Sequence, residues 1–179
     1  LLGWLKYNGH QGVDKTELSR TIPCGDEALS HAIERLTTEN QLVQISNHLH
    51  LQTVLEAMKA RTKSIVATFH QENPARIGMS LEEARSRVEA DFPSALIPRC
   101  LDDLSKEGSI EQDGERVRLK GFTPTRSAKQ TAHCEKILSL LTQGGLTPSR
   151  TQDLPEELGM EQGAIKEAME LLIESEEVI

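Results

Sequence analysis

The sequence predicts a mainly α-helical chain with small β-hairpins, built from three similar units in tandem. Apolar residues at helical spacing recur after 68 residues, twice and without a gap. Behind this helix, in the first two units, the apolar period changes from 3.6 to 2, which indicates strands. The repeated positions are Leu29, Ile33 and Leu36, then Ile97, Leu101 and Leu104, then Ile165, Met169 and Leu172, with an aliphatic residue behind each set at Leu42, Ile110 and Val178.

Two further helices are expected before each repeated helix. Apolar periodicity predicts the first of them over Leu2–Tyr7, Ile65–Phe69 and Ile137–Leu141. The second begins with the pattern Ser/Asp-x-x-Glu, in which a side-chain oxygen caps the first turn and the glutamate returns to the cap. The pattern occurs at Asp14 with Glu17, Ser80 with Glu83, and Asp153 with Glu156.

A hairpin is expected after the repeated helix. In the second unit the turn Asp113-Gly114 leads into a strand where Val117 and Leu119 alternate with basic residues, a strong hairpin signal. The first unit has a similar pattern around a turn near Ser46-Asn47. Three helices and a hairpin in about 60 to 70 residues is the winged-helix plan. The predicted fold is therefore a series of tandem winged helix-turn-helix repeats.

Three domains follow from these elements. Residues 1–52 form winged helix one, 53–120 winged helix two and 121–179 winged helix three. A stretch without Gly or Pro, from Thr53 to Glu72, predicts one long helix entering the second domain. Because the chain opens inside a first helix and stops where a wing should begin, we expect a piece of a longer protein. Phe122, in a turn-rich connection, is expected to pack against a neighbouring unit.

Composition and charge exclude several classes of protein. The net charge is -8, whereas a general nucleic-acid-coating protein carries the opposite sign. No run approaches the roughly 18 apolar residues of a membrane helix. Three cysteines without a C-x-x-C pair exclude zinc and redox motifs, so they are expected to be packing residues in a reducing cytoplasm. The third helices are acidic in the first and third units and roughly balanced in the second, where Arg99 is a candidate phosphate contact.

The best basic feature is the second wing, where Arg116, Arg118 and Lys120 share one strand face. Two interpretations remain open for this face. The cations either contact phosphate groups or pair across the hairpin with Glu111 and Asp113.

No catalytic, cofactor or metal site is predicted. His48 and His50 could offer two ligands to a metal, but no third follows nearby, so we expect solvent-facing wing residues. No nucleophilic side chain stands at a recognisable spacing from any of the other histidines. No glycine-rich phosphate-binding loop occurs in the sequence. The chain is therefore not expected to be an enzyme.

One segment carries a specific resemblance. Residues 69–79 read FHQENPARIGM and residues 82–87 read EEARSR. They resemble the start of the second winged helix in the C-terminal arm of the bacterial selenocysteine-specific translation elongation factor, SelB. Within the segment Arg85 and Arg87 either pair with Glu82 and Glu83 or reach RNA or a neighbouring unit. Gly108–Ile110, Gly121–Pro124 and the third unit look like the same family's continuation.

The resemblance implies a cytoplasmic, monomeric factor that delivers selenocysteinyl-tRNA to the ribosome at recoded UGA codons. In that family an N-terminal GTPase portion, with GTP and Mg as cofactors, precedes four winged helices. The last of them binds the selenocysteine-insertion hairpin of the mRNA. This chain would correspond to winged helices one to three, the third incomplete, so no GTP-site or hairpin-binding residue can be carried over.

Two other functions remain open. One is a tandem winged-helix DNA-binding regulator, against which the acidic third helices argue. The other is a winged-helix scaffold for protein interactions, which the charge pattern permits equally well.

Overall fold

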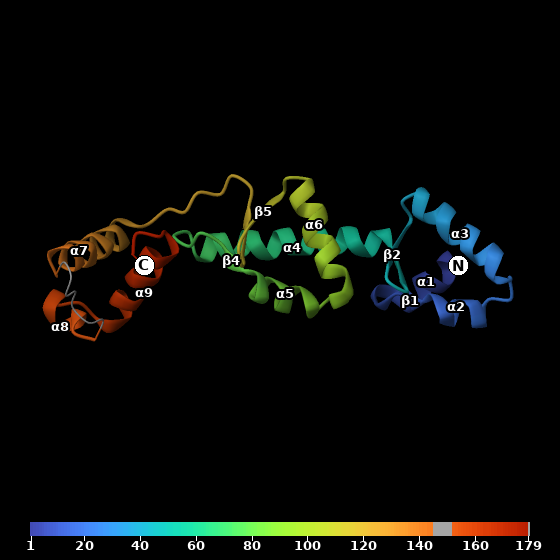
Figure 1. The fold of residues 1–179 in the computed structure, drawn as a ribbon, viewed down its shortest axis with the longest axis horizontal. Coiled ribbons are helices and arrows are strands. Elements are labelled where there is room, and N and C mark those ends of the chain that lie inside the picture. The colour runs from blue at the N-terminus through green and yellow to red at the C-terminus, as the bar shows by residue number, and fades with distance from the viewer. Residues whose placement is uncertain (145–151, 179) are drawn as a thin grey trace. The chain divides into compact units, whose positions relative to one another are not determined.

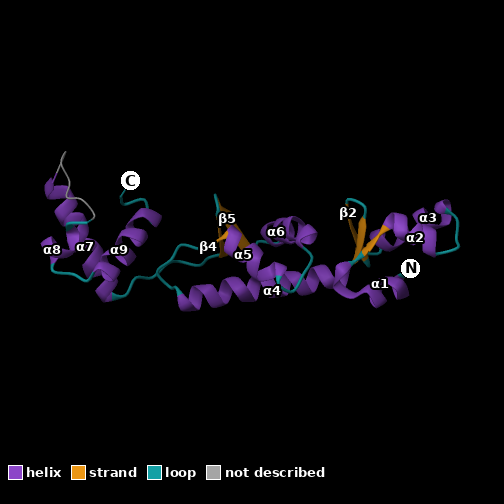
Figure 2. Ribbon diagram, turned by 90° about the horizontal axis from the view of Figure 1, so that it is seen from below, coloured by secondary structure: helices purple, strands orange, loops and turns teal. Residues whose placement is uncertain are grey.

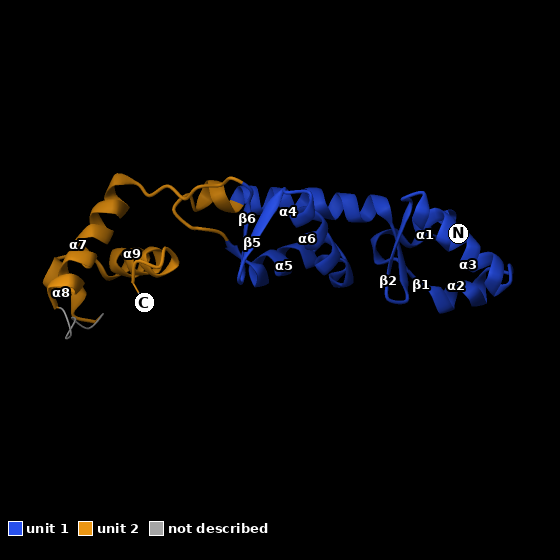
Figure 3. Cartoon of the chain, turned by 45° about the horizontal axis from the view of Figure 1, so that its top comes forward, with its two compact units in different colours: residues 1–68, 79–120 blue, residues 69–78, 121–179 orange. Residues whose placement is uncertain are grey.

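The computed structural model describes residues 1–144 and 152–178, which fall into two compact units. Unit 1 comprises Leu1–Thr68 and Met79–Lys120, and unit 2 comprises Phe69–Gly78 and Gly121–Ile179 (Figure 3). Unit 1 therefore holds the first two winged helices, and unit 2 holds the third together with the segment that precedes the second domain's hairpin sheet. The predicted boundary at residues 120 and 121 coincides with one of these divisions, but residues 69–78 group with the third domain.

The first winged helix has three helices and a three-stranded antiparallel sheet in the order β1-β3-β2 (Figure 1). A short 3-10 turn, η1 (Gly9–Gln11), leads into the first strand. Leu5, Leu18 and Leu49 are fully buried in its core together with the predicted helix face. The elements are α1 (Leu2–Asn8), β1 (Val13–Asp14), α2 (Lys15–Thr21), α3 (Asp26–Thr38), β2 (Leu42–Ile45) and β3 (His48–Leu51).

The second winged helix repeats this plan, with its sheet in the order β4-β6-β5. Both predicted hairpins are thus confirmed, but each gains a two-residue strand, β1 or β4, that the sequence did not predict. So short a strand carries no periodicity of its own. The elements are α4 (Gln52–Glu72), β4 (Met79–Ser80), α5 (Leu81–Glu89), η2 (Ser94–Leu96), α6 (Ile97–Lys106), β5 (Ile110–Asp113) and β6 (Arg116–Leu119).

The long helix α4 is confirmed (Figure 2). Pro74 cannot continue it, and the Asn73 side chain closes its end by donating to the carbonyl of Phe69 at 3.1 Å. Within the second domain, the buried Lys59 of α4 bonds Glu107 at the end of α6. Arg61 bonds Asp91 behind α5 at 3.1 Å. These contacts fix α4 to the rest of its domain.

The third winged helix comprises α7 (Ala128–Gly144), α8 (Leu154–Leu158) and α9 (Gln162–Glu174). The predicted face of its third helix is only partly correct. Ile165 and Leu172 are buried, Met169 is only partly buried against the core, and Ala168 and Leu171 complete the buried face. The buried face of α9 is therefore rotated about the helix axis relative to the face that the 68-residue repeat predicts. The described residues of this domain contain no strand.

The predicted helix caps are present in two of the three domains. Asp14 accepts from the backbone N–H groups of Thr16, at 2.7 Å, and Glu17, at 3.3 Å. Ser80 accepts from Glu83 N–H at 3.1 Å. Asp153 stands at the N-cap of α8, but its side chain makes no cap hydrogen bond, so the predicted cap is wrong there. Its backbone already has helical angles, which differ from the extended conformation of a capping residue.

Two of the three cysteines are buried packing residues, as expected. Burial raises the pKa of the thiols of Cys100 and Cys134, which makes them poor nucleophiles. Cys24 is partly buried against the first core. No helix among residues 1–144 and 152–178 is both long enough and apolar enough to cross a membrane.

Candidate nucleic-acid interface

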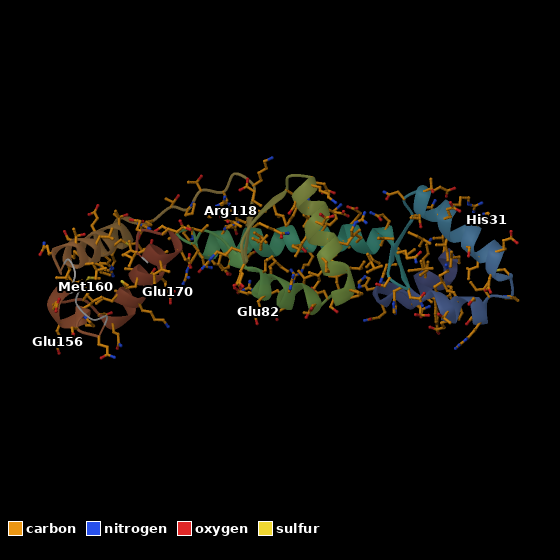
Figure 4. The ribbon with its side chains drawn as sticks, in the orientation of Figure 1. His31, Glu82, Arg118, Glu156, Met160 and Glu170 are labelled. Atoms are coloured by element: carbon orange, nitrogen blue, oxygen red, sulfur yellow. The ribbon has the colours of Figure 1, made fainter. Side chains whose placement is uncertain are left out.

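The wing of the second domain brings its cations opposite carboxylates. In the register of β5 and β6, Glu111 lies opposite Arg118 and Asp113 lies opposite Arg116. Arg118 Nε donates to Glu111 Oε2 at 3.0 Å (Figure 4). Cross-strand pairing, one of the two interpretations left open by the sequence, is therefore present for Arg118. The pairing weakens the attraction between this guanidinium and a phosphate group outside the chain.

Lys120 lies just beyond the end of β6 and is exposed. Its backbone N–H donates to the carbonyl of Ser109 at 3.2 Å, and its side chain lies over Gly108. A Cβ on Gly108 would stand 3.1 Å from Lys120 Nζ, and the positive φ of that glycine, 66°, also disfavours a side chain. The local backbone thus holds the lysine stem against the wing and leaves the ammonium group at its edge.

Two of the three remaining candidates form ion pairs within their own helices. Arg87 bonds Glu83 at 2.6 Å in α5, so the pairing interpretation holds for this residue. Arg99 bonds Asp103 at 2.8 Å in α6, one turn along the same exposed face. Such pairs are typical of solvated helix surfaces and stabilise them only slightly.

Arg85 differs from these residues. It is exposed, and its side chain makes no ion pair with any other residue of the described chain. It lies on one wall of a surface groove of about 620 Å³ between α5, α6 and β5. The other lining residues are Pro98, Leu101, Asp102, Ser105, Ile110, Glu111 and Gln112. The two groove carboxylates are engaged by Lys106 and Arg118, so Arg85 is the cation best able to meet an anion there.

The third helices of the other two domains offer little positive charge. On α3, Arg35 pairs with Glu39 at 3.6 Å, and His31 is exposed beside four acidic residues of the same helix region (Figure 4). On α9, Lys166 is the single cation in a helix rich in glutamate. These helices would repel a phosphate backbone, as their composition predicts.

The segment with the specific resemblance has a structural role that the sequence did not reveal. Arg76 bonds Glu170 and Glu174 of α9 through separate guanidinium nitrogens. Desolvation alone would lower the pKa of Arg76, but its hydrogen bonds to Glu174 and Glu170 outweigh it and raise that pKa. Glu170 and Glu174 stand four residues apart, a spacing that could have indicated a shared partner.

Neighbouring residues of this segment also contact the third domain. Ala75 belongs to the core that contains Cys134 and Leu171. The carbonyl of Pro74 accepts from Thr125 N–H at 2.7 Å. Phe122 stacks on His70 with ring centroids 3.6 Å apart, which confirms that the linker phenylalanine packs against a neighbouring element. Residues 69–78 therefore belong to the third winged helix by packing, pairing and backbone hydrogen bonds.

The two wing histidines of the first domain differ in environment. His48 is exposed, as predicted, but His50 is 1% exposed, so the expectation of a solvent-facing residue is wrong for it. β3 is the central strand of its sheet, and His50 lies against the backbone near Gly12. No group of three or more potential metal ligands occurs in the part of the chain that the structure describes.

Comparison with known proteins supports the resemblance. Residues 64–119 match a family described as the winged helix of elongation factor SelB. Over 177 residues the chain is 22% identical to a selenocysteine-specific elongation factor of Desulfomicrobium baculatum. The match covers 97% of this chain and 28% of that relative. The winged-helix fold and the similarity of residues 64–119 to this elongation-factor family are thus confirmed.

Proposed function

We propose that the chain is part of the arm of a selenocysteine-specific elongation factor, because residues 64–119 match a winged helix of the SelB type. The full factor delivers selenocysteinyl-tRNA to the ribosome at recoded UGA codons in the cytoplasm. The arm spaces a GTPase portion from a last winged helix that binds the mRNA hairpin. In this proposal the GTP and Mg site, and with it nucleotide hydrolysis, belong to the GTPase portion of the factor and not to the arm.

The observation that carries the proposal is the match along nearly all of this chain to one factor of that class. The character of the surface supports a spacing role over a reading role. Third helices that are acidic, or whose cations pair within the helix, make poor contacts to a nucleic-acid groove. The segment at residues 69–78 is structured. A flexible linker in its place would keep no fixed distance between its ends.

A graft tests this function in the complete factor. The chain would replace the matched region of the Desulfomicrobium baculatum factor, and selenocysteine incorporation at an in-frame UGA would be measured in cells lacking their own factor. We expect the graft to restore incorporation. A Gly/Ser linker of equal length, as the control, should not, because it leaves the two functional ends without a fixed separation.

Equal activity of the linker and the graft would refute the spacing role.

Duplex DNA binding separates the proposal from a DNA-binding regulator. A DNA-binding regulator would bind a specific duplex with higher affinity than a scrambled duplex at physiological salt. The proposed arm should bind both duplexes equally weakly, with an affinity that falls steeply as salt rises.

A further inference from the structure

Three of the six histidines gather where the first two winged helices meet inside unit 1. His48 and His50 come from β3, and their rings lie 6.4 Å apart. His10 of η1 stacks on Phe92, which follows α5 in the second domain, with ring centroids 5.3 Å apart. The ring contact joins side chains that are distant in sequence, so it forms only when the two domains are together.

His50 is enclosed at this junction. Its side chain is 1% exposed, and neither ring nitrogen makes a hydrogen bond of good geometry among the described residues, although the backbone of His10 lies near enough to favour the charged ring. Gly12 allows the enclosure, since a Cβ there would stand 2.4 Å from His50 Nδ1. The ring also borders a small pocket of about 470 Å³, whose far wall is Glu89, Phe92 and Pro93 of the second domain.

We propose that the junction between the first two winged helices is acid-labile, and that proton uptake by His50 separates the two domains. An imidazolium ion in this position would hold a charge away from water with no acceptor for its second N–H. Opening the junction returns the ring to solvent, where the charge is hydrated. The neutral ring is compatible with the closed junction, and the charged ring favours the open one.

The groups around His50 do not offset that charge. His48 on the same strand repels a proton on His50, and the backbone of His10 on η1 favours the charged ring but does not outweigh its desolvation. β2 and η2 carry no titratable residue. Glu89 of α5 is the carboxylate that borders the pocket, and it makes no hydrogen bond or ion pair with His50 in the described structure.

The direction of the pH effect follows from this environment. Desolvation, the largest cause, lowers the pKa of His50 below the usual value of 6.5; a backbone hydrogen bond with His10 opposes this shift, and the charge of His48 adds to it. Because the folded-state pKa is lowered, the closed junction has its full stability above pH 6.5. It loses stability as the pH falls below that value toward the folded-state pKa.

NMR of the whole chain between pH 7.5 and 5 tests the proposal. We expect the ring contact of His10 with Phe92 to be lost as His50 titrates. Hydrogen exchange of residues 89–96 should accelerate, by at most about tenfold per pH unit for a single proton. The amides of α7 and α9 in unit 2 should keep their protection, which distinguishes opening of the junction from global unfolding.

His50→Phe should abolish the pH dependence, because phenylalanine keeps a ring and cannot be protonated. His48→Gln, on the exposed position of the same strand, is the matched control and should retain it. Far-UV circular dichroism at pH 7.5 would verify folding, and His50→Gln replaces the first variant if it misfolds. Titration of His50 at or above pH 6.5 with the ring contact intact would overturn the proposal. Unchanged acid opening in the folded His50 variant would do so as well.

Discussion

Single buried aliphatic residues determine whether these small domains fold. Each winged helix has only three helices, with a small sheet in the first two, so a few side chains supply most of the buried apolar area. On α6, Leu101 is 6% exposed and Leu104 is fully buried. On α9, Ile173 is 55% exposed. Residues on third helices therefore differ widely in their contribution to stability.

Leu101→Ala should lower the free energy of unfolding by roughly 2 to 5 kcal/mol, through lost apolar burial and a cavity. Chemical denaturation followed by circular dichroism measures this change. Ile173→Ala, an aliphatic truncation on the related helix α9, is the control and should cost less than about 1 kcal/mol because little area is lost. An unchanged denaturation midpoint for Leu101→Ala would mean that the helix face is wrong.

Arg76→Gln should destabilise unit 2 by about 1 to 3 kcal/mol, since it leaves Glu174, whose side chain is 5% exposed, without this partner. The loss should shrink at high salt, because the pair with Glu170 is partly exposed. Thermal unfolding across a salt series measures both effects. Arg87→Gln, which breaks an exposed pair in α5, should cost within about 0.5 kcal/mol. Full additivity of Arg76→Gln and Glu174→Gln would contradict the pairing.

Helix caps and short strands set the boundaries of the elements. β4 and the cap of α5 adjoin each other, since Met79–Ser80 pairs with β6 and Ser80 then caps the helix. β1 and α2 have the same arrangement, with Val13–Asp14 on β3 and Asp14 as the cap. The extended conformation required of an N-cap residue suits a strand, so one residue serves both elements.

Ser80→Ala should therefore cost about 1 kcal/mol of stability through loss of the hydrogen bond from Glu83 N–H. Urea denaturation of the two proteins gives the difference. Asp153→Ala is the matched control, because the side chain at that N-cap makes no cap hydrogen bond, and its loss should be smaller. A larger effect at Asp153 would show that its side chain caps α8 after all.

Across the whole molecule, charge disfavours nucleic-acid binding while one groove permits it. The net charge of -8 repels phosphate at long range. Three of the six candidate cations of the second domain form ion pairs with carboxylates, and the exposed Arg85 forms none with the described residues. Any RNA contact of this arm should therefore be weak and centred on the groove beside α5.

Fluorescence anisotropy with a selenocysteine-insertion hairpin and a scrambled hairpin tests this expectation. Arg85→Ala should weaken both RNAs alike and flatten the log-log salt dependence by about one, as for one lost phosphate contact. Arg118→Ala should have a smaller effect, because Glu111 already holds that guanidinium. Nanomolar discrimination between the two RNAs would show that specific recognition begins within these three domains.

Calorimetry with GTP and Mg should show no binding in the micromolar range. The chain has no glycine-rich loop of the kind whose backbone N–H groups cradle phosphates. Micromolar affinity would contradict the assignment of the chain to the arm alone.

The sequence by itself determined the repeat, the order of helices and hairpins, and the two caps at Asp14 and Ser80. These features depend on local patterns, because the period of apolar residues reports which face of an element is buried. The family relationship also came from the sequence, through the segment at residues 69–87. The same patterns indicated the wing carboxylate pairs, since cross-strand partners follow from the hairpin register.

Only the tertiary structure decided which residues oppose those faces. Arg76 and Glu174 are 98 residues apart in the chain, and no local pattern relates them. His48 and His50 share one face of β3, yet the first is exposed and the second buried, because the backbone at Gly12 lies against the His50 ring. On α9, Met169 is only partly buried, whereas Ala168 and Leu171 are buried. Periodicity describes one element, whereas burial and pairing depend on what the folded chain places against it.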